Sequence, residues 1–219
     1  MTDKNWTDTR RFDDKAAEWD DNARRAALAD AVARAITAHM PIGKPQNALE
    51  FGCGTGLVTT RIAPRCARLT AVDSSREMIR MLTEKIAAGN IPNIELLHLD
   101  FSRPETATEL AGDFDFVFSS MTLHHIPDPA SFLRELIGHM SPGGTLSIAD
   151  LDAEEGYFHD DPSEQVHHGF ERSVLQAMLE SAGFTNVAFI TAHLIEKKNR
   201  AGEQTAYPIF LVTAVKPKA

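Results

Sequence analysis

A glycine triplet directly behind an acid carries the clearest chemical signal in this sequence. Glu50 precedes Gly52, Gly54 and Gly56 in the run EFGCGTG, which follows a short apolar segment and precedes a stretch that can form a helix. Glycine lets a backbone turn tightly and approach a ligand, and the free amides at a helix start bind polar ligand atoms. The spacing differs from the G-x-G-x-x-G of dinucleotide sites, and a carboxylate here would repel a pyrophosphate. The loop therefore predicts a site for a ligand that carries positive charge.

Two more acids stand at the ends of later apolar runs. Asp73 lies about twenty residues past the loop, where an acid binds ribose hydroxyls in nucleotide folds. Asp73 could also take part in capping the helix that begins at Ser74, and the two roles are compatible. Asp100, with Phe101 beside it, offers the acceptor and the apolar surface that an adenine ring needs, although an acid there is also common in turns.

Histidines gather in two places. His124 and His125 follow the fourth apolar run, and one of them could remove a proton from a substrate, or both could hydrogen-bond the backbone of their loop. His, Asp and Tyr side chains also crowd the segment from Tyr157 to His168. Their spacing is not that of metal ligands, so no metal is predicted. We expect this segment to form a wall of the substrate site.

The elements that would position these residues alternate along the chain. A helix is expected over 12–40, where apolar residues recur at spacings of three and four and glycine and proline are absent. After it, short apolar runs alternate with helical segments, which is typical of a doubly wound α/β sheet with helices on both faces. The expected strands are 47–51, 67–72, 94–99, 115–118 and 144–149, and the expected helices are 56–63, 74–88 and 129–140.

The last third of the chain departs from this rhythm. Residues 152–170 are polar, acidic and rich in histidine, and we interpret them as an insert on the substrate side. A helix over 171–182 and two strands over 187–196 and 207–215 follow, and their polar turn favours an antiparallel hairpin at the sheet edge. The prediction is a seven-stranded, mostly parallel sheet, with a helical cap over residues 1–45 and a binding domain over 46–219.

Composition disfavours several classes of function. The 219 residues carry a net charge of −9 and no run of five Lys or Arg, which argues against an obligatory nucleic-acid partner. Cys53 and Cys66 have no metal-ligand spacing and cannot form a disulfide framework. The polar N-terminus lacks the apolar core of a signal peptide, and no stretch is apolar enough to span a membrane. We therefore expect a cytoplasmic protein, whose oligomeric state the sequence does not indicate.

Five stretches in order resemble the class I S-adenosylmethionine-dependent methyltransferases, in the branch similar to the ubiquinone and menaquinone biosynthesis methyltransferases. They are ALEFGCGTGLVT (48–59), AVDSSREMI (71–79), LHLDFS (97–102), FDFVFSSMTLHHIPDP (114–129) and LSIADL (146–151). The opening RFDDKAAEWD (11–20) also resembles the N-terminal cap of that family. The resemblance implies a Rossmann-like fold with S-adenosylmethionine as the cofactor.

The resemblance also implies roles for the matching residues. The glycines would lie against the methionine part of the cofactor, with Glu50 near its amino group and Ser119 approaching the same end. Asp73 would hold the ribose hydroxyls, and Met78 would pack on the adenine. The aromatic residues of the cap would help to close it. The implied cofactor-binding residues are Phe12, Trp19, Glu50, Gly52, Cys53, Gly54, Thr55, Gly56, Asp73, Ser74, Met78, Asp100, Phe101 and Ser119.

These observations predict in-line transfer of a methyl group to a small-molecule acceptor. The sulfonium already activates the methyl group, so transfer needs placement and exclusion of water more than acid–base residues. A base, at His124 or His125, is required only if the acceptor must lose a proton. A non-catalytic protein that binds S-adenosylmethionine or S-adenosylhomocysteine is an alternative. A nicotinamide-dependent oxidoreductase is disfavoured by the glycine spacing, and a nucleic-acid methyltransferase by the acidic balance.

Overall fold

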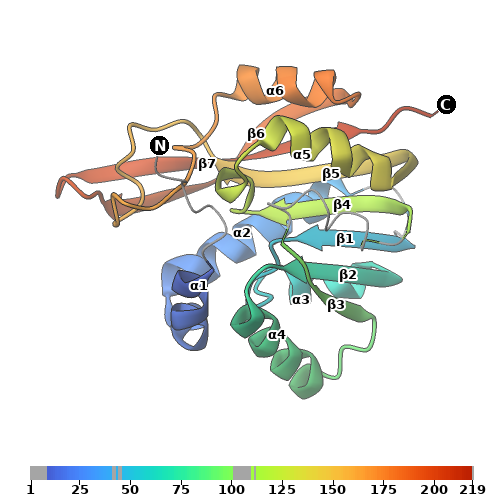
Figure 1. Cartoon of the computed structure of the whole chain (residues 1–219), viewed down its shortest axis with the longest axis horizontal. Coiled ribbons are helices and arrows are strands. Elements are labelled where there is room, and N and C mark those ends of the chain that lie inside the picture. Colours follow the sequence, from blue (N-terminus) through green and yellow to red (C-terminus); the bar gives the residue numbers. More distant parts are fainter. Residues whose placement is uncertain (1–8, 41–42, 44–45, 101–109, 111, 219) are drawn as a thin grey trace.

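The structure is a computed structural model that describes residues 9–40, 43, 46–100, 110 and 112–218, and their strands form one sheet of seven (Figure 1). The first five strands run parallel, and the sixth and seventh form an antiparallel hairpin in which β7 pairs with β5. The predicted fold class is thereby confirmed. In their order across the sheet the strands are β3 Ile94–His98, β2 Arg68–Asp73, β1 Asn47–Phe51, β4 Phe114–Ser120, β5 Met140–Leu151, β7 Gln204–Val215 and β6 Thr185–Lys198.

Helices pack on both faces of this sheet. Two of the longer ones begin with a side-chain cap that the sequence supplies: Ser75 caps α4, and Asp128 caps α5. The helical segments of the described residues are α1 Arg10–Lys15, η1 Ala16–Asp21, α2 Ala23–His39, α3 Thr59–Ile62, η2 Ala63–Arg65, α4 Arg76–Gly89, η4 Leu123–His125, α5 Pro129–Leu136, η5 Ile137–His139 and α6 Arg172–Ser181.

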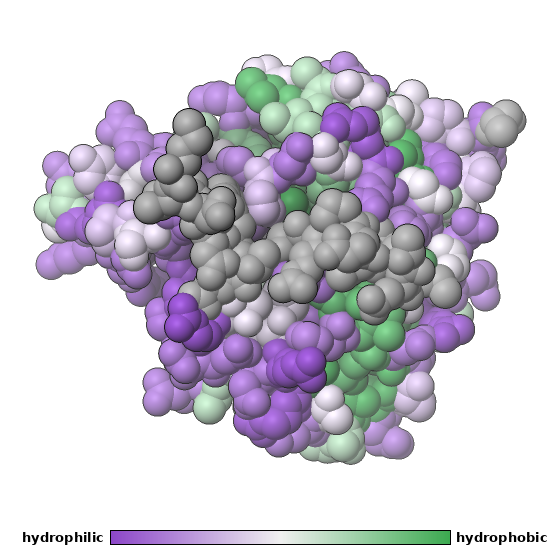
Figure 2. All heavy atoms as spheres, viewed as in Figure 1, coloured by the Kyte–Doolittle hydropathy of each residue, from purple (hydrophilic) through white to green (hydrophobic). Residues whose placement is uncertain are grey.

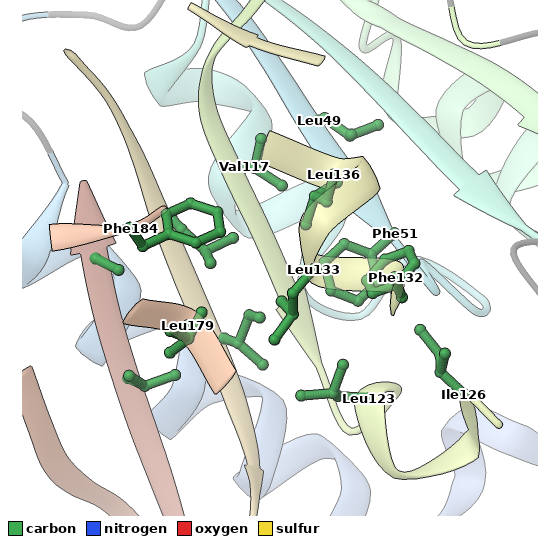
Figure 3. Close-up of a cluster of buried hydrophobic side chains, with 14 of the residues drawn as sticks. Leu49, Phe51, Val117, Leu123, Ile126, Phe132, Leu133, Leu136, Leu179 and Phe184 are labelled. Atoms are coloured by element: carbon green, nitrogen blue, oxygen red, sulfur yellow. The ribbon is translucent and has the colours of Figure 1, made fainter. Parts of the chain in front are cut away.

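One face of the sheet is covered by α5 and α6. Because side chains alternate along a strand, Leu49 and Phe51 of β1 share this face. They join Phe132 of α5 and Leu179 of α6 in one apolar cluster (Figure 3). The rings of Phe51 and Phe132 meet edge to face, with centroids 5.0 Å apart. This cluster anchors β1 directly beneath the glycine loop.

The opposite face is covered by α2 and α3. Ala48 of β1 and Phe116 of β4 pack there against Val32 and Ile36 of α2, and all four side chains are buried. With both faces covered, the central strands are apolar along their length rather than alternating. That physical constraint is why the apolar runs predicted these strands.

The predicted helix over 12–40 is wrong as a single element. The chain forms α1 and the 3-10 turn η1, and then restarts as α2 after Asn22. Asn22 has an extended backbone, and its side chain accepts hydrogen bonds from the backbone amides of Arg24 and Arg25. An asparagine that bonds the next turn competes with helix continuation, which explains the break.

Other boundaries differ by a few residues. The helix expected from Gly56 begins at Thr59, the helix expected to reach Met140 ends at Leu136, and β5 is longer than predicted at both ends. Residues 153–169 connect β5 to α6 without a helix or a strand, as expected for the insert. The insert returns to the sheet where Asp152 and Phe170 form an isolated bridge.

Hydrophilic side chains predominate over the region of α1 and α4 in Figure 2, and apolar patches also reach this face of the molecule. Among the helices of the described residues, none combines the length and the apolar character that crossing a membrane requires.

Candidate active site

A cavity of about 740 Å³ opens at the carboxyl ends of the parallel strands. The loops after these strands meet here, which is where α/β sheets bind their ligands. The first helices and residues 158–165 of the insert complete its walls. Most residues singled out from the sequence line it: Phe12, Trp19, Glu50, Gly52, Cys53, Gly54, Thr55, Asp73, Ser74, Met78, Asp100, His124 and His125.

The three glycines of the loop after β1 are required for different reasons. All three have positive φ, so each favours glycine conformationally. A Cβ on Gly52 would lie 2.0 Å from Oγ1 of Thr122, and one on Gly56 would lie 2.2 Å from Cδ1 of Leu82. A Cβ on Gly54 would meet no described atom within 4 Å. Gly52 and Gly56 therefore allow close packing within the protein, whereas Gly54 leaves open space in the cavity wall.

Glu50 is a buried acid at the end of β1. Only 1% of its surface is exposed, and its Oε2 atom has no hydrogen-bond partner among the described residues. Burial raises the pKa of Glu50 to about 8. A buried polar atom without a partner is costly, so this carboxyl group at the cavity wall is suited to a ligand that donates hydrogen bonds or carries positive charge.

Asp73 links the glycine loop to the start of α4. Its Oδ2 atom accepts a hydrogen bond from the Gly54 amide at 2.7 Å, and its Oδ1 atom accepts one from the Ser75 amide at 2.9 Å. Burial raises the pKa of Asp73 in spite of these bonds. The helix expected to begin at Ser74 begins at Arg76, where the Ser75 hydroxyl caps it by accepting a hydrogen bond from the Met78 amide, and Ser74 lines the cavity.

His124 is held by an acid that the sequence reading missed. Asp150, at the end of β5, is fully buried, and its Oδ1 atom lies 2.6 Å from Nδ1 of His124. Asp150 also accepts hydrogen bonds from the amides of His124 and Leu151. A carboxylate that bonds Nδ1 keeps the proton on that nitrogen, which leaves Nε2 as the basic atom. The sequence did contain a signal for Asp150. It is an acid at the end of the fifth apolar run, just as Asp73 and Asp100 stand at the ends of the second and third runs.

His125 has a different environment. Its ring lies 4.1 Å from the ring of His124 and meets Phe12 of α1 edge to face at 5.2 Å. Burial, followed by the nearby charges of His124 and Arg11, lowers the pKa of His125 well below its ordinary value. His125 is thus an uncharged side chain that lines the cavity and packs against Phe12 of α1.

The insert contributes His159 and Glu164. Nδ1 of His159 lies 2.8 Å from Oε1 of Glu164, and Arg11 of α1 forms an ion pair with the other carboxylate oxygen. Burial lowers the pKa of His159 to about 3. His167 instead holds the loop: its amide donates to the His124 carbonyl, and its Nε2 lies 2.9 Å from the Ile126 carbonyl.

Acidic side chains of the first helices contact the loop after β1 and the start of α4. Asp20 accepts a hydrogen bond of 2.6 Å from the Thr55 hydroxyl and forms an ion pair with Lys85 of α4. Asp13 accepts one of 2.6 Å from the Ser75 hydroxyl. These contacts bring Trp19 to the cavity, where the guanidinium of Arg25 stacks 3.7 Å above its ring.

Two of the expected residues that the structure describes, Ser119 and Gly56, are not part of the cavity lining. Ser119 is buried and donates a hydrogen bond of 2.7 Å to the Phe51 carbonyl, while its neighbour Ser120 reaches the cavity because adjacent side chains of a strand point to opposite sides. Gly56 packs against Leu82 behind the loop. Phe101 lies outside the described residues.

Comparison with known proteins identifies relatives of one kind. The family described as a methyltransferase domain matches residues 21–188. An uncharacterised methyltransferase of Mycobacterium tuberculosis is 38% identical over 130 residues, which cover 59% of this chain and 59% of the relative. The trans-aconitate 2-methyltransferase of Azoarcus is 32% identical over 134 residues, covering 59% and 49%. The chain thus spans about half to three fifths of these relatives.

The fold has close counterparts among solved structures. The N-methyltransferase NodS of Bradyrhizobium japonicum, in complex with S-adenosyl-L-homocysteine, matches with a TM-score of 0.67 at 18% identity. The match covers 95% of this chain and 98% of that one. At this identity the similarity supports the fold, and the site must be argued from the residues themselves.

Proposed function

Because this chain belongs to the methyltransferase domain family, in the class I group that depends on S-adenosylmethionine, we propose that it methylates a small-molecule acceptor bound between His124 and the insert. The observation that carries the proposal is the open side of Gly54 next to the unpartnered Oε2 atom of Glu50. A cationic ligand that lies close to backbone suits this pair.

The residues present fit the cofactor. Glu50 offers a buried oxygen to the amino group, and Gly54 leaves space for the methionine chain beside it. Asp73 keeps acceptor lone pairs for ribose hydroxyls, because its two oxygens together offer about four lone-pair sites and the amides of Gly54 and Ser75 occupy two of them. Met78 and Asp100 line the part of the cavity that we assign to the adenine ring.

The bound cofactor supplies a methyl group activated on a sulfonium. The chain itself has to place the acceptor, exclude water and take up any proton that is released. The N-terminal helices and the insert both lie over the cavity, which serves the exclusion of water. Of the two adjacent histidines, we assign proton uptake to His124, because Asp150 orients it and stabilises its charged form.

Titration calorimetry with S-adenosylhomocysteine tests the cofactor site. Gly54→Val fills the open space with a branched side chain, so its affinity should fall by at least about 100-fold. Gly202→Val is the matched control, because Gly202 also has positive φ with nothing within 4 Å but lies in the hairpin turn.

Wild-type affinity of the Gly54→Val variant would contradict the assignment. NADH serves as the competing ligand, and we expect no heat of binding because the glycine loop lacks the G-x-G-x-x-G spacing of dinucleotide sites. Release of S-adenosylhomocysteine by the wild type in the presence of small acceptors separates an enzyme from a protein that only binds the cofactor.

A further inference from the structure

We propose that the methyl acceptor is an uncharged group that donates a hydrogen bond, a hydroxyl or an amine N–H, and that His159 and Glu164 of the insert select it together with His124. The inference rests on the proposed function and names the acceptor class for the same site.

The acceptor end of the cavity presents hydrogen-bond acceptors. Nε2 of His159 is buried and has no hydrogen-bond partner among the described residues, and Oε1 of Glu164 is buried with Nδ1 of His159 2.8 Å away. The Glu164 side chain is only 10% exposed, and both residues line the cavity. The rings of His124 and His159 lie 5.3 Å apart, and both residues line the cavity. A buried acceptor without a partner, such as Nε2 of His159, calls for a ligand that donates a hydrogen bond.

The protonation of the two imidazoles follows from their carboxylates. Nδ1 of His124 lies 2.6 Å from Oδ1 of Asp150, and Nδ1 of His159 lies 2.8 Å from Oε1 of Glu164. A lone pair on either Nδ1 would repel a carboxylate oxygen at such a distance, so both nitrogens carry the proton. Each Nε2 atom is then a lone pair available to the acceptor.

Two cations beside His159 are already paired. Arg11 forms its ion pair with Glu164, and Nζ of Lys197 lies 2.9 Å from Oδ1 of Asp160 and donates to the Phe158 carbonyl at 2.6 Å. A carboxylate acceptor placed at Nε2 of His159 would therefore meet a lone pair and the anionic side chain of Glu164. A hydroxyl or amine finds several partners, which is the basis of the selection.

The transfer step balances with these groups alone. The acceptor heteroatom forms its bond to the methyl carbon as the carbon–sulfur bond breaks, and the electron pair of that bond stays on sulfur. The proton of the acceptor passes to Nε2 of His124, whose positive charge Asp150 stabilises. His159 and Glu164 accept hydrogen bonds from the substrate and orient it, and His124 returns its proton to water after the product leaves.

Imidazole nitrogen NMR of the full chain tests the proposal without any acceptor. We expect both His124 and His159 to carry the proton on Nδ1 at pH 7. Asp150→Asn should change the tautomer balance of His124 alone, and Glu164→Gln that of His159 alone. The exposed His39, which contacts its own helix, provides the control variant His39→Gln. If Nε2 of His124 or Nε2 of His159 carries the proton in the wild type, the proposal is overturned.

Binding of matched probes tests the acceptor class. Phenol, aniline, benzoate and thioanisole share one ring and differ in the group that a methyl transfer would use. With protein loaded with S-adenosylhomocysteine, phenol or aniline should bind at least about tenfold more tightly than benzoate and thioanisole. Glu164→Gln replaces a carboxylate by an amide that can donate a hydrogen bond. The variant should therefore show a smaller difference in affinity between phenol and benzoate than the wild type. Preference for benzoate or thioanisole in the wild type would overturn the proposal.

The cofactor assignment and the acceptor class can be contradicted independently. If S-adenosylhomocysteine does not bind, the proposed function fails, although the tautomers remain measurable. Suppose instead that S-adenosylhomocysteine binds normally. If Nε2 of His124 or His159 then carries a proton, or if benzoate binds more tightly than phenol and aniline, only the proposed acceptor class fails.

Discussion

Glu50 is the single residue whose charge should change most when the cofactor binds. In the ligand-free protein, burial raises the pKa of its carboxyl group to about 8, so the group is mostly protonated at pH 7. An ammonium placed beside Oε2 favours the ionised form and lowers that pKa. Cofactor binding is thus coupled to loss of a proton at this one position.

The wild type should release close to one proton on binding S-adenosylhomocysteine at pH 7. The measurement is calorimetry in two buffers with different ionisation enthalpies. Glu50→Gln should release none and should bind more weakly. Glu95→Gln, in an exposed ion pair with Arg68, is the control. Equal proton release from the wild type and Glu50→Gln would contradict the role of this carboxyl group.

Among the elements, α1 and η1 depend on contacts made far away in the sequence. The apolar clusters centre on the sheet and the longer helices, whereas this segment reaches α4 and the glycine loop through Asp13 and Asp20 (Figure 1). Polar contacts that are partly exposed contribute little to global stability. They can nevertheless control how readily the segment leaves the cavity.

Asp20→Ala removes the acceptor of the Thr55 hydroxyl and the partner of Lys85. We expect S-adenosylhomocysteine to bind about two- to tenfold more weakly, mainly through faster dissociation, since these contacts are worth about 0.5–1.5 kcal/mol. Stopped-flow displacement measures the dissociation rate. Asp30→Ala, which removes a partly exposed ion pair with Arg61 outside the cavity lining, should leave that rate unchanged. An unchanged rate for Asp20→Ala would show that the segment does not act as a cover.

At the scale of the whole molecule, the stability of the fold is linked to the histidines of the cavity. Burial lowers the pKa of His159 to about 3, and that of His125 also lies well below its ordinary value. Between the folded pKa and the unfolded value of about 6.5, the unfolded chain binds more protons than the folded one. These two residues therefore make the folded state less stable as pH falls below about 6.5.

Lowering the pH from 7 to 5 should cost the wild type up to about 2 kcal/mol of unfolding free energy through His159 alone. His159→Gln has no group to titrate in this range, so its loss of stability over the same interval should be smaller by a similar amount. Urea unfolding of both proteins at the two pH values gives the comparison. Equal losses would mean that His159 is not held neutral in the fold.

Much of this architecture was readable from the order of residues. Both faces of the central strands are buried, so apolar runs such as 47–51 identified them, and the spacing of Gly52, Gly54 and Gly56 identified the loop. The break at Asn22 was missed because periodicity alone does not show whether an asparagine side chain bonds the next turn or faces solvent.

The sequence alone determined the fold class and the cofactor-type loop, because both depend on residues that are neighbours in the chain. Only the tertiary structure decided what each glycine does, since the clash at Gly56 comes from Leu82 on α4. The same holds for the acceptor site, where Asp150 orients His124 and Arg11 meets Glu164 across separations that no local pattern reports. Those contacts depend on burial and on the packing of segments that are distant in the sequence. They orient the side chains at the end of the cavity that we propose for the acceptor.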